Sequence, residues 1–166
     1  MIVAFTGHRP DKLGGYASET KHPAGKRAKI ERALATLLGA KLQPTGAISG
    51  MALGVDQWAA WVCSDLGIPW IAAVPFDGQE SRWPTEAQRI YHTLLARAYG
   101  TKVVTPGRPL DRHDAALRMQ ARNQWMVEHC QLLIAVFDGS PGGTKNCVDY
   151  ALRVRREIRL IDPTTL

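Results

Sequence analysis

The feature that most constrains this sequence is an apolar run, followed by a glycine turn and then by a stretch with helical spacing. Residues 132–137 (LLIAVF) form the run, residues 138–146 (DGSPGGTKN) contain the turn, and helical spacing starts at residue 147. A strand, turn and helix in this order leave free backbone N–H groups at a helix N-terminus, where the dipole favours a phosphate or carboxylate. A tight turn that binds nothing is the alternative interpretation of the same residues.

Strands and helices alternate along the whole chain. The expected strands are 2–5, 47–48, 68–75, 102–104, 132–137 and 158–161; the expected helices are about 24–42, one through 59–63, 85–99, 115–129 and one from 147. This alternation predicts an α/β protein with right-handed crossovers. We expect a Rossmann-like three-layer sandwich with a mainly parallel central sheet, and residues 1–166 as a single domain.

The charge balance leaves the kind of partner open. The chain has 21 Lys and Arg residues against 15 Asp and Glu, a formal net charge of +6. A nucleic acid, an anionic small ligand and a solvated basic surface all fit this excess. Part of it gathers around the first helix and part near the C-terminus: Lys21, Lys26, Arg27, Lys29, Arg32, Arg153, Arg155, Arg156 and Arg159.

Several classes of protein are disfavoured. No apolar run reaches the roughly 18 residues that span a bilayer, and the N-terminus leads into a short strand and not into a signal sequence, so we expect a cytoplasmic protein without a membrane partner. Cys63, Cys130 and Cys147 are scattered and lack CxxC spacing, which indicates neither disulfides nor a zinc site. No set of His, Asp and Glu has metal-ligand spacing, and we expect no metal and no cofactor.

Polar, glycine-containing segments follow four of the expected strands. They are residues 6–9, 49–56, 76–83 and 138–146. Ligands of parallel sheets bind beyond the carboxyl ends of the strands, so these segments are predicted to form one ligand site. Turn and capping chemistry would place Gly, Ser and Asp there as well.

Three of these segments resemble the motifs of one family. Residues 5–10 (FTGHRP), 49–56 (SGMALGVD) and 138–144 (DGSPGGT) are similar, in order and spacing, to the SLOG superfamily, specifically its stand-alone YpsA-like members from bacteria and phages. The resemblance covers nearly the whole chain and implies a Rossmann-like pocket for a nucleotide or nucleotide-derived ligand. The superfamily also includes the DNA-processing protein DprA and the Lonely Guy (LOG) enzymes, which cut the N-glycosidic bond of nucleoside monophosphates.

The LOG enzymes can be compared residue by residue. Residues 119–126 (MQARNQWM) are similar to their Met-x-x-Arg-Lys-x-x-Met helix, so Arg122 matches the catalytic arginine and Asn123 replaces the lysine. Their turn reads Pro-Gly-Gly-x-Gly-Thr-x-Glu-Glu. Residues 141–149 lack its third glycine and keep one carboxylate, Asp149, at the position of the second glutamate.

This departure limits the enzymatic interpretation. Hydrolysis of an N-glycosidic bond needs a carboxylate beside the sugar, and Asp149 is one methylene shorter than Glu. Glu80 is the alternative carboxylate near the rim. A solvated Asp149, and an Arg122 paired with Glu128 or Asp114, are the structural alternatives.

The remaining candidates have ligand-binding interpretations, and most have structural ones as well. Arg9 is placed to contact a phosphate, and His8 serves as an acid, a hydrogen-bond donor or a structural residue. Asp56 binds a ribose hydroxyl or caps its own loop. Phe76 and Trp83 stack on a base or act as lid or interface residues.

The expected site and functions are therefore as follows. The catalytic candidates are Arg122, Asp149 and Glu80. The ligand-binding candidates are Thr6, Gly7, His8, Arg9, Ser49, Gly50, Met51, Gly54, Asp56, Phe76, Trp83, Asn123, Asp138, Gly142, Gly143 and Thr144. Binding or sensing of a nucleotide ranks first, a LOG-like nucleoside-monophosphate N-glycosidase second and DprA-like nucleic-acid binding third. LOG relatives dimerise through helices beside the site, which implies a homodimer.

Overall fold

Six strands form one parallel sheet in the order β4-β3-β2-β1-β5-β6. The computed structural model describes residues 1–16 and 25–166. The strands are β1 (Ile2–Gly7), β2 (Gly46–Ser49), β3 (Trp70–Val74), β4 (Gly100–Val103), β5 (Leu132–Val136) and β6 (Glu157–Ile161). The predicted parallel sheet is confirmed.

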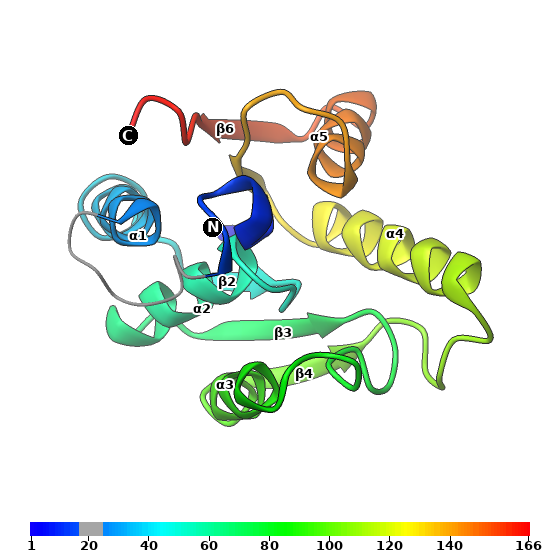
Figure 1. Ribbon diagram of the computed structural model, residues 1–166. Helices are drawn as coiled ribbons and strands as arrows, with labels where there is room; N and C mark the ends of the chain where they lie inside the picture. Colours follow the sequence, from blue (N-terminus) through cyan, green and yellow to red (C-terminus); the bar gives the residue numbers. More distant parts are fainter. Residues whose placement is uncertain (17–24) are drawn as a thin grey trace.

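Helices cover both faces of this sheet. The helices are α1 (Lys26–Thr36), its π-helical continuation η3 (Leu37–Leu42), α2 (Val55–Asp65), α3 (Thr85–Leu95), α4 (Arg112–Glu128) and α5 (Gly143–Arg153), with a short 3₁₀ turn, η1 (Pro10–Lys12). Figure 1 shows α1 and α2 on one side of the sheet and α4 and α5 on the other. The Rossmann-like three-layer sandwich predicted from the alternating pattern is confirmed.

Side chains along each central strand alternate between two cores. Val3 and Phe5 of β1 pack in the core that contains Leu34 of α1, whereas Ala4 packs in the core that contains Met126 of α4. Leu133 of β5 joins Ala4 on that second face. Because both faces of these strands are buried, their sequences are continuously apolar and do not alternate with polar residues.

Several helices differ in their bounds from the sequence prediction. Helix α5 begins at Gly143, before the expected residue 147. Helix α4 begins at Arg112, before the expected residue 115, because the Asp111 side chain accepts a hydrogen bond from the Asp114 N–H and caps the helix. Helix α3 ends at Leu95, before the expected residue 99, and Tyr99 N–H instead donates to Trp70 O beside the sheet. The expected start of the first helix at residue 24 lies outside the described residues.

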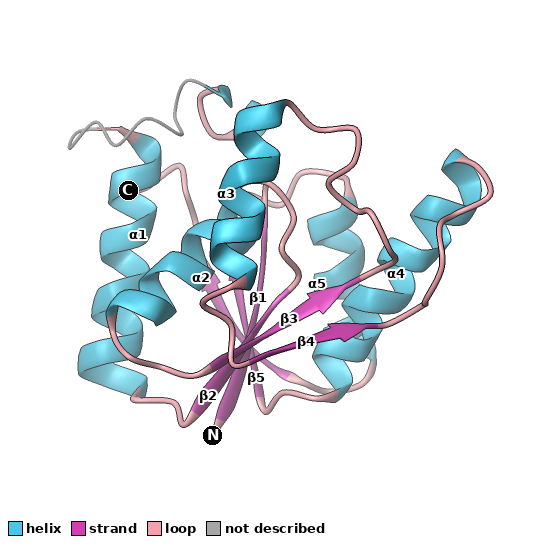
Figure 2. Cartoon of the chain, turned by 90° about the horizontal axis from the view of Figure 1, so that it is seen from below, coloured by secondary structure: helices cyan, strands magenta, loops and turns pink. Residues whose placement is uncertain are grey.

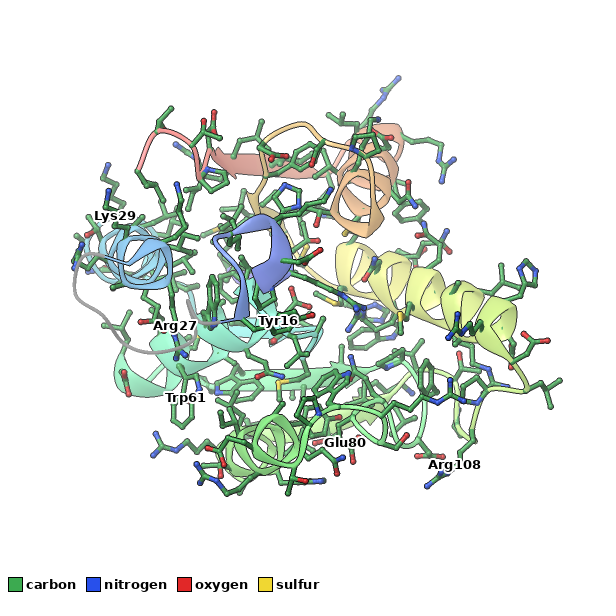
Figure 3. All side chains as sticks on the ribbon, in the orientation of Figure 1. Tyr16, Arg27, Lys29, Trp61, Glu80 and Arg108 are labelled. Atoms are coloured by element: carbon green, nitrogen blue, oxygen red, sulfur yellow. The ribbon has the colours of Figure 1, made fainter. Side chains whose placement is uncertain are left out.

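The predicted basic cluster on α1 contacts the C-terminal segment and a neighbouring carboxylate. Lys26 Nζ donates to Pro163 O at 2.5 Å and Lys29 Nζ donates to Leu166 O at 2.9 Å. Arg27 Nε contacts Glu31 Oε1 at 2.8 Å, and Figure 3 shows Arg27 and Lys29 on α1. Lys21, the remaining lysine of this predicted group, lies outside the described residues. These contacts give the α1 charges a structural role.

The strand order reverses between β1 and β5. From β1 the chain winds outward through β2 and β3 to β4, and α4 then returns it to the other side of β1, where β5 and β6 follow. Figure 2 shows the fanned strands of the twisted sheet, with α4 projecting beyond the arrowheads of β3 and β4. In open parallel sheets a crevice forms at such a reversal, beyond the carboxyl ends of the strands.

Two further expectations concern the cysteines and the helices. Cys63, Cys130 and Cys147 are buried and free, as expected from their spacing. Over residues 1–16 and 25–166, no helix combines the length and the apolar character that crossing a bilayer requires.

We predict that Leu34→Ala destabilises the protein by about 2–5 kcal/mol, because it leaves a cavity in the core between α1 and the sheet. Leu34 is 0% exposed, whereas Leu152 on α5 is 62% exposed and provides the matched control. Urea unfolding followed by circular dichroism measures both, and Leu152→Ala should change the free energy of unfolding by less than about 0.5 kcal/mol. Equal losses in the two variants would contradict this description of the core.

Candidate functional site

A cleft of about 230 Å³ lies where the strand order reverses. The loops after β1, β2 and β5 and the middle of α4 contribute to it. Its lining contains the following candidates from the sequence: Thr6, Gly7, His8, Arg9, Asp56, Arg122, Asn123, Gly142, Gly143 and Thr144. The structure thus brings together in one cleft three loops that are far apart in the sequence.

The N-terminus of α5 forms one wall of this cleft. Gly142 is the cap residue, with φ 143°, and no side chain makes a capping hydrogen bond. The first helical bond runs from Asn146 N–H to Gly142 O at 3.0 Å, so the earlier N–H groups, including those of Gly143 and Thr144, have no acceptor within the helix. The first turn of α5 contains no acidic residue. This end of α5 therefore favours an anion.

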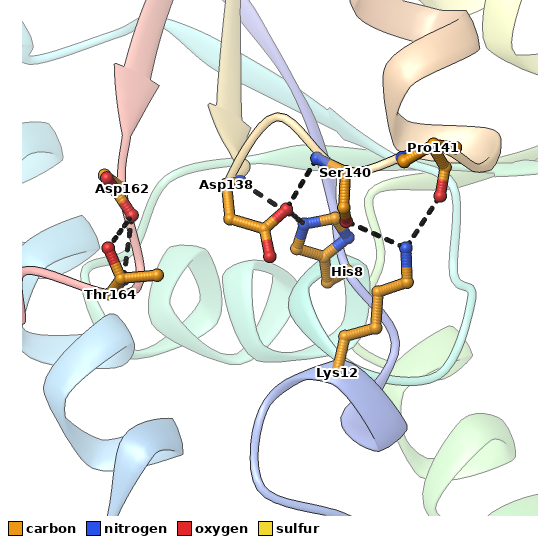
Figure 4. A network of polar contacts seen from close by, with 7 residues as sticks. All are labelled: His8, Lys12, Asp138, Ser140, Pro141, Asp162 and Thr164. Atoms are coloured by element: carbon orange, nitrogen blue, oxygen red, sulfur yellow. Dashed lines mark hydrogen bonds and ion pairs between the residues drawn. The ribbon is translucent and has the colours of Figure 1, made fainter.

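Two side chains, Lys12 and His8, make polar contacts that hold the glycine turn against the segment after β1 (Figure 4). Lys12 Nζ donates to Ser140 Oγ at 2.9 Å and to Pro141 O at 2.7 Å. His8 Nε2 lies 2.7 Å from Asp138 Oδ1. Hydrogen bonds from Ser140 and the contact with His8 lower the pKa of the Asp138 carboxyl below its ordinary value. Asp138, a ligand-binding candidate, thus lies behind the cleft wall and positions the turn.

Arg122 is the most deeply buried charge of the cleft, with 4% of its surface exposed. Its Nη1 donates to Gly50 O and, at 3.4 Å, to Ala73 O, and its Nε donates to Asn123 Oδ1 at 2.9 Å. These bonds attach α4 to the ends of β2 and β3. Desolvation lowers the pKa of Arg122, while the nearby Asp56 carboxylate opposes that effect.

Neither of the two carboxylates considered as structural partners pairs with Arg122. Asp114 pairs with Arg118 at 3.0 Å, and Glu128 accepts a hydrogen bond from the Tyr150 hydroxyl. The charge of Arg122 is balanced instead by the carbonyl oxygens and by Asp56 nearby.

Asp56 is buried beside Arg122, with Gly50 between them. A Cβ atom at position 50 would lie 2.4 Å from Arg122 Nη1 and 2.6 Å from Asp56 Oδ2, so any other residue there would displace these two charged groups. Burial raises the pKa of Asp56 from 3.8 to about 6, against the opposing effects of Arg122, the Ala52 N–H and Arg9. The cleft therefore contains a carboxylate that is protonated at mildly acidic pH.

The other predicted residues of the second loop shape the wall and do not line the cleft. Ser49 Oγ donates to Asp56 O at 2.8 Å and accepts from Met51 N at 3.2 Å. Met51 is buried in the core and has φ 60°. Gly54 has φ 95°, and His8 O lies close to the position that a Cβ atom would occupy there. Ser49, Gly50, Met51 and Gly54 thus fix the loop that presents Asp56.

Phe76 and Trp83 line a larger cavity of about 490 Å³ that adjoins the cleft. The two hollows share Arg9 and Met119 in their linings. The Trp83 ring packs edge-on against Tyr91, with 5.5 Å between ring centroids. The aromatic candidates are therefore next to the cleft, across Arg9 and Met119, and not inside it.

Asp149 and Glu80, the two carboxylates considered for catalysis, line neither hollow. Asp149 is exposed on α5 and lies 2.6 Å from Lys145 Nζ, one turn earlier on the helix. Glu80 lies 3.3 Å from His92 Nε2, and Figure 3 shows it beside α3. Within the described part of the chain, the carboxylates in the cleft lining are Asp11 and Asp56.

The sequence reasoning missed several residues that line these hollows. Lys12 and Asp11 line the cleft, and Lys12 follows the FTGHRP motif by two residues, which was a usable signal. Met119 lies one helical turn before Arg122 and so belongs to the same helix face. Arg82, Arg108 and Arg112 line the larger cavity, and no periodic pattern marks them.

No cluster of three or more His, Cys, Asp or Glu side chains suited to a metal occurs in residues 1–16 and 25–166. The cleft lining offers backbone N–H groups, the exposed cations Arg9 and Lys12, and the buried Arg122 guanidinium beside the buried Asp56 carboxyl group.

The sequence is similar to those of bacterial and prophage proteins. The profile of the YspA SLOG family (YpsA) matches residues 3–166. The SPbeta prophage-derived protein YoqJ of Bacillus subtilis (strain 168) is 33% identical over 118 residues, which cover 63% of this chain and 67% of that protein. A UPF0398 protein of Bacillus cereus (strain B4264) is 28% identical over 158 residues, covering 90% of this chain and 82% of that protein.

The fold is similar to that of DNA processing protein A (DprA). The X-ray structure of DprA from Streptococcus pneumoniae has a TM-score of 0.64 at 18% identity; the match covers 96% of this chain and 50% of that chain. DprA from Helicobacter pylori, described for its single-stranded DNA binding mode, has a TM-score of 0.60 at 16% identity, covering 99% of this chain and 70% of that chain. At these identities the likeness shows the fold alone.

We predict that ionised Asp56 destabilises the protein at neutral pH and that acid relieves this cost. Because its pKa is about 6 in the folded protein against 3.8 ordinarily, the folded state binds the proton more tightly than the unfolded state. As pH falls from 7 through 6 to 4, wild-type stability should rise relative to Asp56→Asn by about 2.4 kcal/mol. Denaturant unfolding of both proteins across this range measures the difference, in which the other carboxylates cancel. A difference that is flat, or that falls toward acid, would refute the assignment.

Proposed function

The chain belongs to the YspA SLOG family, and on this premise we propose that it binds a nucleotide or nucleotide-derived ligand whose phosphate lies at the N-terminus of α5. The observation that carries the proposal is the arrangement of cations around that helix end. Arg9, Lys12 and Arg122 line the same cleft as Gly143 and Thr144, whose N–H groups have no acceptor within the helix. Backbone N–H groups, a helix dipole and guanidinium groups together form a phosphate-binding environment.

Asp56 supplies the acceptor for the sugar. It lines the cleft from the first turn of α2, directly after the loop that follows β2, and its position is fixed by Gly50 and Ser49. An ionised carboxylate accepts hydrogen bonds from ribose hydroxyls. The pKa of about 6 keeps it mostly ionised at neutral pH, and binding should weaken as Asp56 is protonated.

Binding without turnover fits the positions of the acidic residues better than hydrolysis does. The LOG-like alternative needs a carboxylate beside the sugar together with Arg122. Asp149 pairs with Lys145 on the exposed face of α5 and Glu80 lies beside His92, so neither lines the cleft. Of the residues that the structure describes, Asp11 and Asp56 are the carboxylates of the cleft lining, and Asp56 is buried beside Arg122, where it accepts a hydrogen bond from the Ala52 N–H.

We predict that AMP binds with an affinity that depends on its phosphate and on Arg9. Adenosine should bind at least tenfold more weakly than AMP, and Arg9→Met should weaken AMP binding by about ten- to a hundredfold, because a charge-assisted hydrogen bond contributes about 1.5–3 kcal/mol. Isothermal titration calorimetry measures each affinity, and mass spectrometry of the mixture detects free adenine.

The matched control is Arg89→Met, which removes an exposed arginine paired with Glu86 on α3, far from the cleft lining. This variant should bind AMP as the wild type does. Equal affinity for adenosine and AMP would overturn the proposal. Release of adenine that Arg122→Ala abolishes would favour the LOG-like enzyme instead.

Single-stranded nucleic acid is the second candidate, favoured by the adjoining hollows and by the fold shared with DprA. Arg9 lies in both linings, so a strand passing from the cleft into the larger cavity would meet cations and aromatic rings in succession. One of the DprA proteins with this fold is described for its single-stranded DNA binding mode. Repeated phosphates beside stacking side chains are the usual basis of such binding.

We predict that oligothymidylate binding, if it is the main function, weakens steeply with salt and that Lys12→Met makes the dependence shallower. Each phosphate contact contributes about −0.7 to the slope of log K against log salt for a single strand, so losing one contact reduces the slope by about that amount. Fluorescence anisotropy at several salt concentrations measures the slope. Undetectable binding at the lowest salt, alongside tight AMP binding, would exclude this candidate.

A further inference from the structure

The larger cavity carries a concentration of positive charge that the phosphate cleft does not explain. Arg9, Arg82, Arg108 and Arg112 all line this space of about 490 Å³, and Figure 3 shows Arg108 on the loop between β4 and α4. Throughout the described ranges, none of the four has a carboxylate within 4.0 Å. Four unpaired guanidinium groups around one hollow raise the local positive potential and attract an anion.

The acidic residues in the same lining accept hydrogen bonds from backbone N–H groups nearby. Asp77 Oδ2 accepts a hydrogen bond from Gly107 N–H at 2.6 Å, and Asp111 Oδ1 accepts from Asp114 N–H at 2.8 Å. Both bonds stabilise the backbone of the loops that carry the arginines. The carboxylates therefore position the rim, and the rim keeps an excess of positive charge.

Gln79 adds a polar group in need of a partner at the wall of this cavity. It is 7% exposed, and its Nε2 donates to Gly50 O at 3.4 Å. Because a carbonyl oxygen only accepts, this bond fixes the amide orientation and leaves Oε1 buried without a partner among the described residues. Such an acceptor costs about 1–3 kcal/mol, and a ligand donor would remove that cost once the amide turns its oxygen toward the cavity.

The cavity also offers aromatic surface. Phe76 is buried at the start of the segment between β3 and α3, and Trp83 is held in place by its edge-on contact with Tyr91. Aromatic rings beside guanidinium groups accommodate a nucleobase next to a phosphate. All of these groups surround a space more than twice the volume of the phosphate cleft.

We propose that the larger cavity is a second subsite that takes a second phosphate and a base, so that the ligand is a nucleotide with two separated phosphate groups, of dinucleotide size. The inference rests on the proposed function, because the first phosphate occupies the cleft at α5. Arg9, shared by both linings, lies between the two phosphates. A nucleoside monophosphate fills only the first subsite and leaves Arg82, Arg108, Arg112 and Gln79 without a contact.

The test compares AMP with the 5′-phosphorylated dinucleotide pApA by calorimetry at one fixed salt concentration. Wild-type protein should bind pApA at least tenfold more tightly than AMP. The double variant Arg108→Met/Arg112→Met should lose that advantage and bind AMP unchanged. Gln79→Met should reduce pApA affinity by a smaller factor, again without an effect on AMP.

The matched control is Arg89→Met/Arg159→Met, which removes the same charge from exposed positions on α3 and β6 outside both linings. It should keep the preference for pApA, which separates a local subsite from the net charge of the protein. If the wild type binds neither AMP nor pApA, the proposed function fails. If it binds AMP and pApA equally, the second subsite fails while the proposed function stands. Affinity that keeps rising with strands longer than pApA would overturn a ligand of dinucleotide size.

Discussion

The burial of the Arg122 guanidinium against Gly50 O is the interaction on which the architecture of the cleft depends. A cation so deeply buried needs acceptors, and the carbonyls at the ends of β2 and β3 provide them. A side chain at position 50 would displace the Arg122 guanidinium from this arrangement, together with the neighbouring Asp56 carboxyl group. The hydrogen bonds of Arg122 fix helix α4 to the middle of the sheet. They also place Arg122 and Asp56 in the lining of the cleft that contains the α5 N-terminus.

The electrostatic character of the protein differs between its helices and its loops. On α1, Lys26 and Lys29 bind carbonyl oxygens of the C-terminal segment, so their charges serve the fold. The arginines of the loops around the larger cavity lack such partners within the described chain. The overall charge of +6 is therefore a poor guide to partners, whereas the location of unpaired guanidinium groups is a good one.

The sheet and the glycine turn could be predicted because both are local patterns. A buried parallel strand has to be apolar on both faces, and the turn before α5 needs glycine where φ reaches 143° at Gly142. The reversal between β1 and β5 was not available from the sequence, because strand order depends on long-range packing. Thr144 and Asp149 show why the sequence did not predict which side chains line the cleft. They are five residues apart on α5, so their side chains point in directions that differ by about 140° around the helix axis, and of the two only Thr144 lines the cleft.

Gly50 O accepts hydrogen bonds from two donors that belong to different hollows. Arg122 donates to it from the cleft, and Gln79 donates to it from the wall of the larger cavity. One backbone atom thus positions the walls of both hollows, and a shift of the backbone at Gly50 would move both walls together.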